Sequence, residues 1–215
     1  MGLLKKAGII STTSAGGAAG TAALVHYLSS ENEIKDFSDK IHKERFTLIS
    51  KDEEWSSMLS EYKEKTKGIR GAWFSSGNKE VTLEDLKSAC ERAAKEEVAN
   101  SMDYDEFRRW CTVPKTILSH LSDHGLTALK LNSNDEGDKD SWNKLQEAYL
   151  KRDDNIIYGL LEKLKKNESG TEKWKVFQEA CKGLSEVKST DAEFNFSFKD
   201  FQSWCTKQGV DKLGK

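Results

Sequence analysis

The chain has 215 residues, of which 33% are charged and 36% hydrophobic, and its formal net charge is −2. This balance of charge excludes the strongly basic surface that nucleic-acid-binding domains carry, so we expect no nucleic-acid partner. The chain has a single proline, Pro114, and few runs rich in valine, isoleucine and threonine. Its composition therefore favours a mainly α-helical fold.

The first predicted element is an uncharged segment near the amino end. Ala7 to Ser30 contains no Asp, Glu, Lys or Arg, and roughly twenty uncharged residues suffice to cross a bilayer as a helix. Lys5 and Lys6 precede the segment, which favours an amino terminus inside the cell and a carboxy-terminal domain outside it. We therefore predict a single-pass membrane anchor in residues 1–30, with residues 7–28 in the lipid bilayer.

Two other interpretations of this segment stay open. A cleaved signal peptide also has a basic start and an apolar middle, and the small residues Thr21-Ala22-Ala23 could precede its cut. A flexible soluble tail is the other alternative, because Ser and Thr at positions 11–14 dilute the hydrophobicity. The anchor fits the length and the flanking charges best.

Residues 31–50 are predicted to form a helix that connects the anchor to the rest of the chain. Charged residues alternate here with four apolar residues at nearly helical spacing: Ile34, Phe37, Ile41 and Phe46. Ser50-Lys51-Asp52-Glu53 then matches a capping box, which predicts that a new helix begins at this point.

The remaining sequence carries one hydrophobic pattern twice, which predicts two tandem divergent helical repeats over residues 51–120 and 121–215. Trp55 and Trp142 are 87 positions apart, and Trp110 and Trp204 are 94 apart, so we expect the added residues of the second copy in loops. The copies differ most at a glycine-rich loop around residues 68–77 and at an added helix around 156–164.

Seven aromatic residues of the two copies are predicted to form the repeat core. They recur at helical spacing with Leu, Phe and Cys, which is typical of a packed interior rather than of an aromatic binding surface. These residues are Trp55, Tyr62, Trp110, Trp142, Tyr149, Trp174 and Trp204.

The four cysteines fall two per copy, Cys90 with Cys111 and Cys181 with Cys205. Zinc sites built from four cysteines use closely spaced Cys-x-x-Cys pairs, and the sequence has none, which disfavours a metal site. One disulfide within each copy is the preferred interpretation if the domain is extracellular. Four buried thiols packed as small apolar residues are the alternative.

No catalytic, cofactor-binding or metal-binding motif stands out. His120 and His124 are four residues apart, as in zinc proteases, but Leu121 occupies the position of the glutamate that such enzymes need as a base. We therefore interpret both histidines as solvated linker residues and predict no cofactor.

Several short sequences together resemble a known group of proteins. They are the start Met-Gly-Leu-Leu-Lys-Lys-Ala-Gly, the Gly- and Ala-rich span after it, the L-x-x-x-C pattern, and Trp110-Cys-Thr-Val-Pro114 followed by Lys-Thr-Ile117. Their order resembles the large paralogous families of membrane-anchored proteins in haemotropic mycoplasmas, which are wall-less bacteria that live on red blood cells. The resemblance implies display on the cell surface, with antigenic variation or adhesion as roles, and implies no enzymatic activity.

These observations predict a membrane-anchored, non-enzymatic surface protein that acts in host interaction or antigenic display. Its partners would be the lipid bilayer and a host or membrane protein. The main alternative is an inward-facing helical scaffold that holds a partner protein, and the third is an enzyme whose site follows no recognised motif.

Overall fold

The computed structural model describes residues 34–69, 80–97, 104–132, 135–152, 156–166 and 172–213. Within these ranges the chain forms helices and no strand, so the mainly α prediction is confirmed. The membrane anchor expected in residues 1–30 lies outside them. None of the described helices has the length and apolar character needed to cross a membrane. Lys35–Lys215 forms one compact unit.

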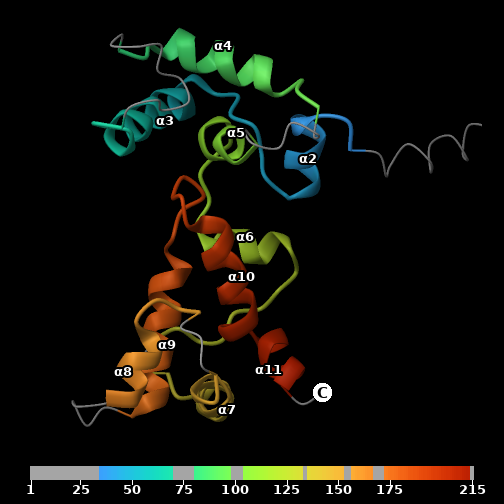
Figure 1. Ribbon diagram of the computed structural model, residues 1–215. Coiled ribbons are helices and arrows are strands. Elements are labelled where there is room, and N and C mark those ends of the chain that lie inside the picture. The colour runs from blue at the N-terminus through green and yellow to red at the C-terminus, as the bar shows by residue number, and fades with distance from the viewer. Residues whose placement is uncertain are drawn as a thin grey trace, which may run out of the picture. The chain divides into compact units, whose positions relative to one another are not determined.

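In the described parts of residues 35–115, called the first half below, the chain forms four helices, which are labelled in Figure 1. They are α2 (Phe37–Lys43), α3 (Asp52–Lys65), α4 (Leu83–Ala93) and α5 (Tyr104–Cys111). α4 packs against α3 and α5, and α2 packs against α5. Thr82 caps α4 as its sequence predicts, since its hydroxyl accepts from the Asp85 amide at 3.2 Å and the Asp85 carboxylate accepts from the Thr82 amide at 3.0 Å.

The helix predicted to start with a cap at Ser50 begins one residue later than expected. Lys51 is the residue before α3, and its backbone N–H donates to the carboxylate of Glu54 rather than Glu53. The capping pattern therefore located the helix but not its first residue.

Within the described residues of 116–213, called the second half, there are six helices, also labelled in Figure 1. They are α6 (Ile117–Asp123), α7 (Lys139–Leu150), α8 (Leu160–Lys166), α9 (Lys173–Ser185), α10 (Phe194–Trp204) and α11 (Lys207–Leu213). α9 lies at the centre of this half, because it contacts α6, α7, α8 and α10. α11, which the hydrophobic pattern did not predict, packs against α7 and α10.

The prediction of one connecting helix over residues 31–50 is wrong for residues 34–50, the part of that segment that the structure describes. α2 spans only Phe37–Lys43, and Arg45 adopts a left-handed backbone with φ of 65°. The Phe46 amide then donates back to the Ile41 carbonyl at 3.0 Å, which closes the helix end. Four apolar residues of the segment are buried in the core: Phe37, Ile41, Phe46 and Ile49. The segment is part of the folded unit.

The same main-chain connections occur in both halves. Gly125 in the second half has φ of 66°, and the Leu126 amide after it donates to Leu121 at 3.3 Å, as Phe46 does to Ile41. The Ile49 amide donates to the Cys111 carbonyl at 3.0 Å, and the Leu129 amide donates to the Cys205 carbonyl at 2.9 Å.

A further matched pair joins the start of α2 and of α6 to the chain that follows a later helix. The Phe37 amide donates to the Glu96 carbonyl at 3.0 Å, and the Ile117 amide donates to the Val187 carbonyl at 2.9 Å. The matched features therefore begin at α2 and α6, ahead of the boundaries expected at residues 51 and 121.

The seven aromatic residues named as repeat core are all buried, and the most exposed of them, Trp55, shows 8% of its surface. The rings of Tyr62 and Trp110 meet edge to face at 5.0 Å and 82°. Those of Tyr149 and Trp204 meet at 5.0 Å and 86°. Burial of such large side chains supplies most of the driving force for a helical unit of this size.

Candidate functional site

The first half meets the second at a buried arginine. Arg108 on α5 is 1% exposed, and its Nη1 donates to the carbonyl oxygen of Ser189 at 2.8 Å. Its guanidinium lies against two neighbouring rings, 5.5 Å from the centre of Phe46 and 5.2 Å from that of Phe194. Burial lowers the pKa of Arg108. Its Nε has no hydrogen-bond partner within the described residues.

A polar cluster holds the same junction from the other side. Lys65 on α3 forms ion pairs with Glu61, at 3.1 Å, and with Asp191, and donates to the Thr190 hydroxyl at 2.9 Å. Burial disfavours the charge of Lys65, but the hydrogen bonds to Asp191 and Glu61 outweigh it and raise the lysine pKa. The pKa of Asp191 is lowered, because its bond to Lys65 outweighs its own partial burial. The halves are thus joined by residues from α3, α5 and the turn before α10.

An open cavity of about 370 Å³ lies at this junction, between α2, α5, α6 and α10. Its walls are aromatic and its rim is charged. The walls include Phe46, His120, Phe194 and Phe198, and the rim includes Lys40, Glu44, Asp105 and Lys199. The Asn195 amide donates to Asp105 at 2.9 Å, so one side of the rim also links the halves.

His120 and His124 meet at the cavity. Their Nε2 atoms are 3.2 Å apart, and both rings belong to its lining. The ring of His120 stacks on Phe46, with 4.2 Å between centroids and 20° between planes. Its Nδ1 has no hydrogen-bond partner within the described residues and lies 3.9 Å from Oδ2 of Asp123.

The interpretation of both histidines as solvated linker residues is wrong for His120, which is 3% exposed. It lies on the buried face of α6 with Ile117 and Leu121. That apolar neighbourhood in the sequence could have indicated its burial. Burial, together with the nearby His124 and Lys115, lowers the pKa of His120 to about 4. His124, at the end of α6, is exposed as expected.

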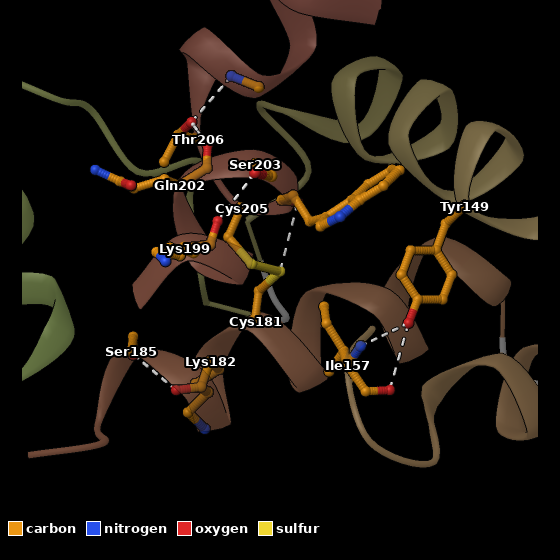
Figure 2. The surroundings of a disulfide bond; sticks show 12 residues. Tyr149, Ile157, Cys181, Lys182, Ser185, Lys199, Gln202, Ser203, Cys205 and Thr206 are labelled. Carbon is orange, nitrogen blue, oxygen red and sulfur yellow. Dashed lines mark hydrogen bonds between the residues drawn. A yellow bond between two sulfur atoms is a disulfide. The ribbon is translucent and has the colours of Figure 1, made fainter. Parts of the chain in front are cut away.

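The cysteines pair within each half, as their spacing predicts. Cys90 on α4 bonds to Cys111 at the end of α5, with Cα atoms 5.6 Å apart. Cys181 on α9 bonds to Cys205 after α10, also with Cα atoms 5.6 Å apart. Figure 2 shows this second bond near Tyr149, whose hydroxyl accepts from the Ile157 amide at 2.8 Å. All four cysteines are buried.

The arrangement is suited to binding. Aromatic walls offer apolar contact, the histidine nitrogens offer ligands or hydrogen bonds, and the rim offers charges of both signs. Within the described residues, no three His, Cys, Asp or Glu side chains are grouped so as to hold a metal ion together.

Arg108 is the junction residue that the sequence did not single out. It lies four positions after Tyr104, one helical turn along α5, and both residues are buried. The position of a charged residue on that buried face was the available signal.

Comparison of the chain with protein families, with curated proteins and with solved structures finds no match.

Proposed function

We propose that the chain is a membrane-anchored, non-enzymatic surface protein whose helical head lies outside the cell and acts by binding or display. The observation that carries this proposal is the pair of buried disulfide bonds, one in each half, at matched positions. Disulfides persist mainly in oxidising compartments outside the cytoplasm. The uncharged segment 7–28, preceded by Lys5 and Lys6, supplies the anchor and the orientation in this proposal.

The head in this proposal consists of two divergent repeats, residues 35–115 and 116–213. Three matched main-chain hydrogen bonds, two left-handed residues and two edge-to-face ring pairs support it. These boundaries include α2 and α6 as the first helix of each repeat. They replace the expected starts at 51 and 121, because the earlier helices share the same contacts.

A disulfide is a large source of stability for a repeat of this size. The two disulfides close loops of 21 and 24 residues, and each would stabilise its half by about 3 kcal/mol. Helical units of fewer than a hundred residues bury a limited core, so this contribution is a large part of their stability.

Binding rather than chemistry is favoured by what the junction offers. It has aromatic walls, a mixed-sign rim and an open cavity of about 370 Å³. The resemblance to surface families of haemotropic mycoplasmas points to host contact or antigenic display as the purpose of such a head.

Two experiments on cells that produce the full chain test the proposal: protease treatment tests the location of the head, and thiol alkylation tests the state of its cysteines. Intact cells are first treated with a protease, and separately the protein is denatured and alkylated with or without reductant. Denaturation matters because buried thiols would escape labelling in the folded protein. We expect protease cleavage of the head in intact cells, and alkylation of all four cysteines only after reduction.

The inward-facing scaffold makes the opposite prediction. Its head would resist protease until the cells are lysed, and all four denatured cysteines would react without reductant. That result would overturn the proposal. The mass of the amino-terminal peptide separates a retained anchor from a cleaved signal peptide.

A further inference from the structure

We propose that His120 and His124 bind one divalent transition-metal ion, of the Zn²⁺, Ni²⁺ and Cu²⁺ class, at the wall of the junction cavity. These ions prefer neutral imidazole nitrogens as ligands. The two residues are one turn apart on α6, and their Nε2 atoms converge to 3.2 Å. The site is independent of whether the head lies inside or outside the cell.

The spacing of the two nitrogens matches the geometry of a metal centre. Zinc–imidazole bonds are about 2.0–2.1 Å long. An ion at that distance from both nitrogens, which are 3.2 Å apart, would see them at an angle of about 100°. This angle is close to the tetrahedral value, so the separation of the two nitrogens suits one shared ion.

The ring of His120 is held in place by aromatic neighbours. It stacks on Phe46 and lies 4.8 Å from the ring centre of Phe198. Its Nδ1 is buried without a hydrogen-bond partner in the described residues and faces Asp123, whose Oδ2 is 3.9 Å away. Lys115 holds that carboxylate at 2.6 Å.

A metal-bound histidine usually donates its other ring N–H to a carboxylate or carbonyl, which fixes the tautomer. Asp123 is placed for this role. A small approach of Asp123 to His120 would satisfy the orphaned Nδ1 and leave the Nε2 lone pair for the metal.

The remaining coordination positions would face the cavity. No third protein ligand is grouped with the pair in the described ranges, so water or a small external ligand would complete the shell. The cavity, of about 370 Å³, has room for such a ligand. A site with two protein ligands and open coordination positions would exchange its ion with solvent. A structural zinc site, in contrast, is closed by four protein ligands.

Metal titration of the tag-free full chain in detergent tests the proposal, with Zn²⁺ measured by calorimetry and Cu²⁺ by electron paramagnetic resonance. We expect one ion per chain and nitrogen ligation of copper. His124→Ala should weaken binding at least tenfold while leaving the far-UV circular dichroism unchanged, because His124 is exposed.

His42→Ala is the matched control, since His42 is an exposed histidine near the end of α2. It should leave the affinity unchanged. The proposal is overturned if neither ion binds, or if His124→Ala binds as tightly as the parent chain. The 3.2 Å contact would then be a hydrogen bond between two imidazoles and nothing more.

Discussion

Arg108 of the first half donates a hydrogen bond of 2.8 Å to the carbonyl oxygen of Ser189 in the second half. The two residues are 81 positions apart, and no carboxylate forms a salt bridge with the arginine among the ion pairs of the described residues. The guanidinium instead lies near the faces of Phe46 and Phe194. Cation–π contact and the carbonyl of Ser189 thus take the place of a counter-ion, and they use residues from both halves.

Arg108→Ala should therefore destabilise the protein by about 3 kcal/mol, because it leaves a void beside the rings of Phe46 and Phe194 and removes the donor to Ser189. Arg109→Ala is the control. Arg109 pairs with Glu106 on its own helix at 2.7 Å and is more exposed, so its loss should cost about 1 kcal/mol or less. Urea denaturation followed by circular dichroism measures both. Equal effects of the two substitutions would contradict the role given to Arg108.

Replacing either cysteine pair by alanine should destabilise the protein by about 3 kcal/mol. The loops closed by Cys90–Cys111 and Cys181–Cys205 span 21 and 24 residues, so the loss of chain entropy is nearly equal and the two double variants should match closely. Denaturation of oxidised parent and variants provides the comparison. Peptide mapping without reductant should find only within-half links, and a peptide joining Cys90 to Cys181 or Cys205 would contradict this pairing.

The sequence predicted the features whose residue types recur in both halves and missed those that carry no such residue signal. Cys spacing and aromatic periodicity recur in both halves, so the pairing and the core positions could be recognised by comparison of one copy with the other. The helix end after α2 was missed because Arg45 takes the left-handed position there. A glycine occupies the equivalent place at Gly125 and carries the usual signal. Arg108 and Ser189 are far apart in sequence, and no local pattern joins them.

Two glycines in the second half should respond in opposite ways to alanine. A Cβ at Gly209 on α11 would lie 2.3 Å from the backbone carbonyl oxygen of Ser203, whereas a Cβ at Gly183 on α9 has nothing within 4 Å. Gly209→Ala should therefore destabilise the protein by about 2 kcal/mol, because α11 must move away from α10. Gly183→Ala should stabilise it by up to about 1 kcal/mol through helix propensity. Thermal unfolding of both variants checks this, and a stable Gly209→Ala protein would contradict the close packing of α10 and α11.

The protein should lose stability between pH 6.5 and about 4 because of His120. Burial, with His124 and Lys115 nearby, lowers its pKa from 6.5 to about 4, so the folded state keeps this ring neutral while the unfolded chain takes up a proton. Stability is then complete above pH 6.5 and falls as the pH approaches 4, by on the order of 2 kcal/mol. Asp191, whose pKa is lowered from 3.8, loses its stabilising effect mainly at and below the acid end of this window. Urea titrations in chelator at each pH measure the loss.

His120→Gln separates this effect from other titrations, because the amide has no proton to gain in that range. The variant is expected to start less stable, since the amide does not stack on Phe46 as the ring does. Its stability should nevertheless change little between pH 6.5 and 4. His42→Gln, which alters an exposed histidine, should keep the full slope of the parent. A slope that survives in His120→Gln would assign the acid sensitivity to another group, since protonation of the buried ring could no longer be its cause.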